Sequence, residues 1–218
     1  MAFKLPAKNR KSRQTAIGRN VRDLDLTSMV DNLLAVYDSA DDDAIAEGEN
    51  WYPNAHEFAR MLTNISSTPI SHYQACGIVA ALSPNTKWSR NQTLAVDLVE
   101  TGDCMHLSGD CIRKARAILE GADWFDVLGG RKVRSFAANV WRPWTHGATT
   151  NDRHIVDAAL GRKTDDATRK LLERIGNYVM VSAALRAAAR RRNRTALVFQ
   201  AIVWVRWRQL HTYNGGDF

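Results

Sequence analysis

The sequence predicts an all-α protein of about ten or eleven helices. Apolar residues recur along most of the chain at the three- and four-residue spacing of one helical face. Four patterns in the first half, each a Ser or Asn followed three positions later by Asp, Glu or Gln, are typical of capping boxes at helix starts. No stretch shows a convincing strand alternation, and the sequence contains no internal repeat.

Four helices are expected in the first half of the chain, one after each capping pattern. The acidic stretch from Asp38 to Glu49 separates the first two and is expected to form a loop. Trp51, Tyr52 and Pro53 stand at the predicted entry of the second helix, where a hydrophobic staple is favoured over a ligand contact. The capping patterns begin at Ser28, Asn54, Ser71 and Ser89.

Seven further apolar segments follow in the second half. Gly121 ends the first, Gly129 stops the second and Pro143 closes the third, because glycine and proline commonly follow the last turn of a helix. The segments span residues 112–119, 124–128, 133–141, 155–160, 167–175, 179–189 and 195–210.

Size and composition favour one soluble domain. The chain has 218 residues, 45% of them hydrophobic, with seven tryptophans, which is enough to bury a core. It shows no apolar run of membrane-spanning length and no secretory signal, so we expect a cytoplasmic protein that does not enter a membrane. Cys76, Cys104 and Cys111 have neither zinc-finger nor C-x-x-C spacing, so they are interpreted as reduced thiols and no metal site or cofactor is expected.

The formal net charge of +7 is concentrated in two segments. Residues 1–22 carry seven basic residues and no acid, and residues 186–208 carry seven arginines and no acid. Such asymmetry favours a polyanionic partner, DNA in particular. The alternative is a flexible tail without a partner, together with a solvated helix face.

One stretch, residues 128–157, combines features suited to chemistry on a nucleic acid. It reads Leu-Gly-Gly-Arg-Lys-Val-Arg-Ser-Phe, then a helical segment, then Thr-Asn-Asp-Arg-His-Ile-Val-Asp. A Gly129-Gly130 turn at a helix start presents backbone N–H groups to a phosphate, and Asp152 opens the next helix with its carboxylate. We therefore expect the Lys132 ammonium and the Asp152 carboxylate to lie near each other.

These residues resemble the core of the helix-hairpin-helix (HhH-GPD) DNA glycosylase superfamily, to which endonuclease III belongs. That family has a Leu-Pro-Gly-Val-Gly-x-Lys hairpin followed by an Asp-Thr-His motif, matched here by Leu128 to Lys132 and by Asp152 to His154. The hairpin is two residues shorter than the family's and lacks its Pro and Val. Three further segments are similar to family helices in the same order: Ile78 to Thr86, Arg113 to Leu119 and Ala196 to His211.

The resemblance implies a two-lobed all-α fold in which the hairpin and the aspartate lie at the rim of a cleft. A flexible basic arm is expected over residues 1–22, and a single helical domain over residues 23–218, with its central lobe at about 70–150. The iron–sulfur cysteines of some relatives are missing, so no cluster is expected.

The resemblance also assigns catalytic roles. Asp152 would stabilise the positive charge that develops on the deoxyribose, or activate water, whereas the alternative is a simple helix N-cap. Asp157 is the fallback carboxylate. Lys132 would attack the sugar to form a Schiff base, whereas the alternative is a phosphate contact. His154 falls on the family's histidine and is expected to pack or hydrogen-bond.

DNA contacts are expected from three places. The hairpin offers Gly129, Gly130, Arg131 and Arg134, with His154 nearby in the motif. The connection after Leu82 offers a base-stacking Trp88 and a wedging Asn85, unless it is an ordinary helix connection with a core tryptophan. The arginine run at 190–194 offers phosphate contacts, unless it is a solvated turn. The residues named for these last two places are Asn85, Lys87, Trp88, Arg90, Asn91, Arg191 and Arg192.

The predicted function is a DNA N-glycosylase that removes a damaged or modified base, with AP-lyase activity added if Lys132 is the nucleophile. One alternative is a non-catalytic DNA-binding module of the same fold, which the shortened hairpin supports. Another is a base-hypermodification enzyme of a phage. No feature predicts an obligate oligomer, so a monomer is expected.

Overall fold

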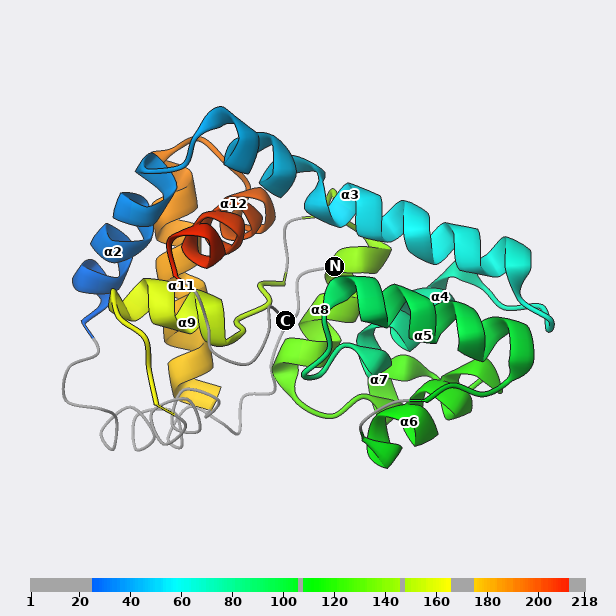
Figure 1. The fold of residues 1–218 in the computed structure, drawn as a ribbon. Coiled ribbons are helices and arrows are strands. Elements are labelled where there is room, and N and C mark those ends of the chain that lie inside the picture. Colours follow the sequence, from blue (N-terminus) through cyan, green and yellow to red (C-terminus); the bar gives the residue numbers. More distant parts are fainter. Residues whose placement is uncertain (1–24, 106–107, 146–147, 166–174, 212–218) are drawn as a thin grey trace. The chain divides into compact units, whose positions relative to one another are not determined.

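The computed structural model describes residues 25–105, 108–145, 148–165 and 175–211 (Figure 1). These residues form ten α-helices and no strand, which confirms the predicted all-α class. The expected arm over residues 1–22 lies outside the described residues, as does the helix expected over 167–175 except for its last residue. The helices are α2 (Leu26–Asp38), α3 (Asp42–Ile65), α4 (His72–Leu82), α5 (Trp88–Thr101), α6 (Gly109–Leu119), α7 (Trp124–Val127), α8 (Arg131–Trp141), α9 (Arg153–Leu160), α11 (Ile175–Arg191) and α12 (Ala196–Leu210).

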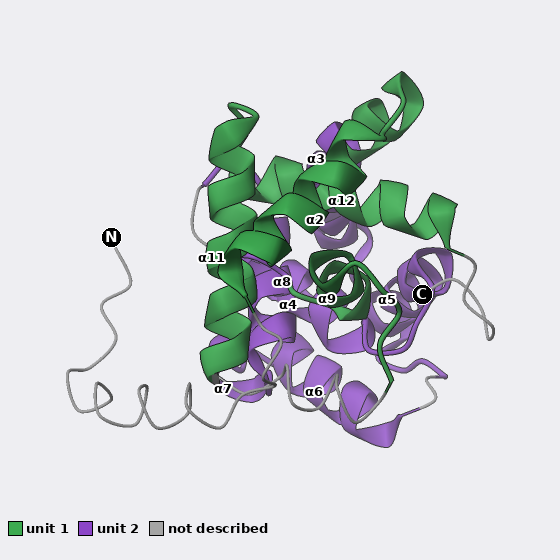
Figure 2. Ribbon diagram, turned by 90° about the vertical axis from the view of Figure 1, so that its left-hand side faces the viewer, with its two compact units in different colours: residues 1–48, 151–211 green, residues 49–150, 212–218 purple. Residues whose placement is uncertain are grey.

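The helices divide into two compact units (Figure 2). Of the described residues, those up to 48 and those from 151 onward belong to unit 1, and those from 49 to 150 belong to unit 2. The chain passes from one unit to the other within α3 and again between residues 150 and 151. The range of 70–150 expected for the central lobe falls inside unit 2.

In unit 1, α9 is the buried helix, and α2, α11 and α12 pack against it. Its side chains from His154 to Ala159 are all buried. Two amides also tie the helices together: Asn32 donates to the Ala159 carbonyl at 3.0 Å, and Asn151 donates to the Tyr178 carbonyl at 3.0 Å. Both ends of α9 are therefore tied to neighbouring helices.

The first part of α3 also belongs to unit 1 and approaches α12 very closely. Gly48 is buried there, and a Cβ built on it would lie 2.6 Å from the Ile202 Cα and 2.7 Å from the Ile202 nitrogen. The two backbones meet at this point because Gly48 has no side chain.

In unit 2, α4 is the central helix, with α5, α6, α7 and α8 packed around it. Every residue of α4 from Ala75 to Leu82 is buried. Gly77 allows α7 to approach, since a Cβ at that position would lie 2.6 Å from the Trp124 Cβ. The Asn91 side chain on α5 donates to the Val79 carbonyl at 3.0 Å, which links α5 to α4.

The capping predictions have mixed outcomes. At α4 the Ser71 box is confirmed, because the Gln74 nitrogen donates to Ser71 Oγ at 3.2 Å and the Ser71 nitrogen donates to Gln74 Oε1 at 2.9 Å. The Ser28 pattern is wrong, since Asp25 caps α2 and the Ser28 hydroxyl donates to Asp25. The Ser89 pattern is also wrong, because α5 begins after Lys87 without a side-chain cap bond.

The predicted loop from Asp38 to Glu49 is wrong, because α3 starts inside it and continues through Pro53 to Ile65. Asp42 and Asp43 lie in the first turn, where the helix dipole favours negative charge, and Asp41 Oδ1 accepts from the Ala44 nitrogen at 2.9 Å. Asn54 is consequently an exposed residue inside the helix, not its cap, and the predicted helix entry at residues 51–53 is also interior.

The three cysteines are free and buried. Burial raises the pKa of the Cys76 thiol to about 12 and also raises the pKa of the Cys104 thiol. Because the thiolate is the reactive form, we expect the folded protein to react very slowly with a disulfide reagent such as DTNB at pH 8.

The absorbance of the thiolate that DTNB releases counts the reactive cysteines, and it is measured before and after guanidinium is added. The expected result is three reactive thiols only after denaturation. Prompt reaction of Cys76 in the folded protein would contradict the buried position.

Among the described residues, no helix is long and apolar enough to cross a membrane.

Candidate functional site

Asp152 begins α9 in unit 1, and both of its carboxylate oxygens are held. Oδ1 accepts from the Ile155 nitrogen at 2.9 Å, so Asp152 is an N-cap. Oδ2 accepts from the Trp204 indole Nε1 at 2.8 Å. The side chain is half-buried, and a carboxylate has about four lone-pair positions, so two donors leave acceptor capacity for a further group.

The surroundings of Asp152 are aromatic and cationic. The Arg208 guanidinium lies over the Trp204 ring, 4.3 Å from its centroid, and the His154 ring is nearly perpendicular to that indole, with 6.2 Å between the ring centroids. Arg153 Nε donates to His154 Nε2 at 3.5 Å. The guanidinium groups of Arg208 and Arg153 thus contact the Trp204 and His154 rings beside Asp152.

His154 is 2% exposed, which agrees with the expected packing role. Burial lowers the pKa of His154, and the nearby Asp152 carboxylate only partly offsets this effect. The imidazole is therefore neutral at pH 7. A neutral buried imidazole accepts and donates hydrogen bonds but adds no positive charge to the site.

Asp157, the fallback carboxylate, is fully buried one turn further along α9. Its Oδ1 accepts from the Thr164 nitrogen at 3.0 Å and from the Thr164 hydroxyl. These contacts fix the segment that follows α9 to the helix. Of the two carboxylates, only Asp152 is accessible to a ligand.

The Gly-Gly turn lies in unit 2, between α7 and α8. Gly130 has a φ of +73°, a conformation that glycine adopts readily, and no side chain caps the first turn of α8. Arg134 is half-buried in the turn: its Nε donates to the Leu128 carbonyl at 2.6 Å, and its guanidinium lies over the Phe125 ring. Arg134 therefore holds the turn in shape.

Gly129, Arg131 and Lys132 are exposed at the uncapped start of α8, where backbone N–H groups and positive side chains favour an anion. Lys114 of α6 also lies near the turn, with its Nζ 3.6 Å from the position of a Cβ on Gly129. The exposure of Lys132 favours a phosphate contact over a nucleophile, since its ammonium group is not desolvated. Lys132 belongs to unit 2 and Asp152 to unit 1.

The five residues named around the connection from α4 to α5 differ in burial, and three of them, Trp88, Arg90 and Asn91, lie in α5 itself. Asn91 is 1% exposed and bonded to α4, so it is a core residue and not a contact for DNA. Trp88 is half-buried against the Trp51 and Phe58 rings, at 5.4 and 5.6 Å between centroids. The exposed residues are Asn85, which has a φ of +55°, Lys87, and Arg90, which donates to the Met105 carbonyl at 2.9 Å.

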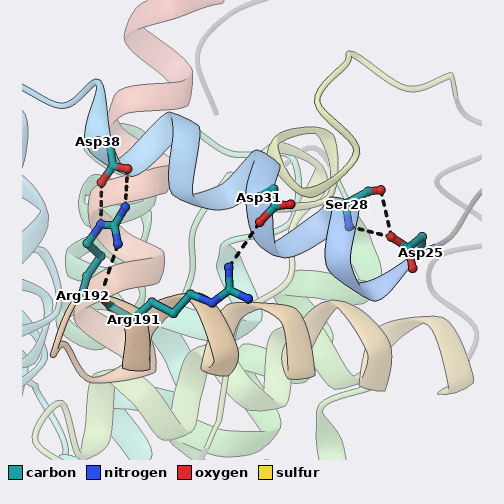
Figure 3. A network of polar contacts seen from close by, with 6 residues as sticks. All are labelled: Asp25, Ser28, Asp31, Asp38, Arg191 and Arg192. Atoms are coloured by element: carbon teal, nitrogen blue, oxygen red, sulfur yellow. Dashed lines mark hydrogen bonds and ion pairs between the residues drawn. The ribbon is translucent and has the colours of Figure 1, made fainter.

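Arg191 and Arg192 are exposed, but both form ion pairs across unit 1 (Figure 3). Arg192 makes a two-pronged contact with Asp38, with Nε donating to Oδ1 at 2.6 Å, and Arg191 contacts Asp31 at 3.3 Å. The Arg192 contact lowers the pKa of Asp38. These two arginines link the end of α11 to α2, which favours a structural role over phosphate binding.

The hydrogen bond between the Trp204 indole and Asp152 was not predicted from the sequence. The two residues are 52 positions apart, and no local pattern connects them. The ion pairs of Arg191 with Asp31 and of Arg192 with Asp38 were also not predicted from the sequence. Both acids lie in α2, far away in the sequence, so no local pattern connects them with the arginines. Among the described residues, no group of three metal-ligating side chains is suitably placed to hold a metal ion.

Comparisons with known proteins give one match. No curated protein and no solved structure matches the chain. A family profile matches residues 15–211, nearly the whole chain and all of its described helices. The chain therefore belongs to DUF7178, a family of unknown function.

Proposed function

We propose that this protein is a DNA N-glycosylase, in which Asp152 is the catalytic carboxylate. The observation that carries the proposal is the double anchoring of Asp152 by the Ile155 backbone and the Trp204 indole. A carboxylate fixed by two donors, half-buried and with acceptor capacity to spare, suits the stabilisation of a positively charged sugar. The resemblance of residues 128–154 to the helix-hairpin-helix glycosylases supports the same assignment.

The proposed reaction is hydrolysis. Water attacks the anomeric carbon of the deoxyribose, a C–O bond forms and the C–N bond to the base breaks, with its electron pair leaving on the base. Asp152 accepts the proton from water and stabilises the positive charge on the sugar during the reaction. The departing base takes up a proton from solvent.

The substrate must first leave the base stack, because the reacting bond is inaccessible inside a duplex. In unit 2, the Gly-Gly turn with Arg131 and Lys132 is proposed to hold a phosphate. The exposed Asn85 and the half-buried Trp88 are proposed to fill or stack against the gap. These groups offer a phosphate contact, a wedge and a π face.

The test is incubation of the pure protein with labelled DNA oligonucleotides that carry a panel of damaged and modified bases. Breaks that appear only after alkali treatment indicate a glycosylase without lyase activity and identify its base. Breaks without alkali, together with a borohydride-trapped adduct lost in Lys132→Gln, indicate a lysine nucleophile. Salt-sensitive binding without any break would contradict the glycosylase and favour a DNA-binding module, the second candidate, which the exposed cations at α8 support.

The phosphate contact by Lys132 predicts a change in the salt dependence of binding. Lys132→Gln removes one phosphate contact, so we expect the slope of log K against log[salt] to fall in magnitude by about 0.9. Fluorescence anisotropy with a labelled duplex at several salt concentrations measures this slope.

Arg60→Gln is the matched control in unit 2. It also removes one exposed positive charge, but Arg60 is paired with Glu57 on the surface of α3. Equal changes of slope in the two variants would show that Lys132 acts only through net charge.

A further inference from the structure

We infer that Trp204 is the positioning residue for the Asp152 carboxylate, and this inference rests on the proposed function. The Trp204 indole Nε1 donates to Asp152 Oδ2 at 2.8 Å, while the other oxygen is held by the Ile155 backbone. One oxygen is thus fixed by α9 itself and the other by α12. The capping bond to Oδ1 alone would still allow the carboxylate to rotate, and the second donor, to Oδ2, prevents that rotation.

The indole is itself fixed on its helix. Arg208 lies one turn further along α12 with its guanidinium 4.3 Å from the Trp204 ring centroid, a cation–π contact. The His154 ring is nearly perpendicular to the same indole, with 6.2 Å between the ring centroids. These two contacts restrict the orientation of the indole and therefore the direction of its N–H bond, as an oriented catalytic group requires.

The choice of residue type also points to positioning. An indole donates one hydrogen bond and accepts none, so it cannot take a proton from Asp152 or from water. Its N–H therefore orients the carboxylate without competing for the transferred proton.

Trp204→Phe tests the inference, because it keeps an aromatic ring beneath Arg208 but removes the N–H donor. We expect kcat for base release to fall by about 10–100-fold with little change in KM, since misplacement of a catalytic group mainly affects the chemical step. Trp207→Phe, on the same helix, is the control: Trp207 is 3% exposed and its ring stacks on His211. It removes an indole N–H from a side chain that is more buried than the half-buried Trp204, so its packing cost is at least as large, and it is expected to retain kcat.

A second measurement is independent of catalysis. The chain has seven tryptophans, and the indole N–H signal of Trp204 in an ¹H–¹⁵N spectrum is the one lost in Trp204→Phe. We expect Asp152→Asn to move that signal, because the acceptor changes from a carboxylate to an amide. Asp25→Asn, which alters the cap of α2, should leave it in place.

An unmoved Trp204 signal in Asp152→Asn would overturn the inference, and so would a Trp204→Phe enzyme with the wild-type kcat. If the wild-type protein releases no base, the proposed function fails, whereas the spectrum still decides whether Trp204 holds Asp152.

Discussion

Replacing Asp152 with asparagine should reduce the rate of base release by about 10²–10⁴-fold, the range typical of losing a general base. The variant cannot take the proton from water and places no negative charge beneath the sugar. DNA affinity should persist, because the proposed phosphate contacts are made by other residues. Single-turnover kinetics with enzyme in excess, together with anisotropy on the same duplex, separate the two effects.

The fold should survive this change. Asparagine caps helices about as well as aspartate, so the bond from the Ile155 nitrogen can be kept. The amide has only one oxygen, so one of the two hydrogen bonds to the carboxylate is lost, and a hydrogen bond to a charged group contributes about 1.5–3 kcal/mol. Circular dichroism should therefore show a folded protein with lower stability.

Asp25→Asn is the matched control for capping. Asp25 caps α2 in the same unit, with its side chain accepting from the Ser28 nitrogen at 2.8 Å, and it has no role in the proposed site. This variant should keep full activity. If Asp152→Asn were also fully active, Asp152 would be a cap and nothing more.

The candidate carboxylate could be found from sequence because it depends on local chemistry. An aspartate just before an apolar helical face marks a helix start, and Asp152 does begin α9. Its partner could not be found in that way. Trp204 reaches Asp152 only through the packing of α12 on α9, and an apolar helix rich in tryptophan gives no signal for which ring faces which residue.

Helix existence was more predictable than helix boundaries for a similar reason. The apolar periodicity of a helix is repeated over many residues, whereas its first residue depends on which of several neighbouring residues acts as the cap. At α2, Asp25 and Ser28 are both good caps, and the helix starts at the earlier one. At α3, acids that suit a loop equally suit the positive end of a helix, and burial of Gly48 against α12 favours the helix.

Gly48→Ala is expected to be the most damaging single-methyl substitution in unit 1. The added Cβ would lie 2.6 Å from the Ile202 Cα and 2.7 Å from its nitrogen, and these backbone atoms of α12 cannot rotate away. Overpacking of this kind typically costs about 1–3 kcal/mol, and here it opposes the gain of about 1 kcal/mol that alanine brings to a helix interior. Thermal unfolding followed by circular dichroism should show a lower midpoint, by about 2–4 °C for each kcal/mol lost.

Gly109→Ala provides the comparison that isolates the clash. Gly109 is the first residue of α6, is exposed, and a Cβ there meets nothing within 4 Å. Both variants gain a methyl group in a helix, and helix propensity favours alanine more at the interior Gly48 than at the first residue of α6, so a lower free energy of unfolding for Gly48→Ala reports the contact with Ile202. We expect Gly109→Ala to be neutral or slightly stabilising. A midpoint for Gly48→Ala equal to that of Gly109→Ala would show that α3 and α12 are farther apart than described, because only separation of the two backbones would leave room for the methyl group.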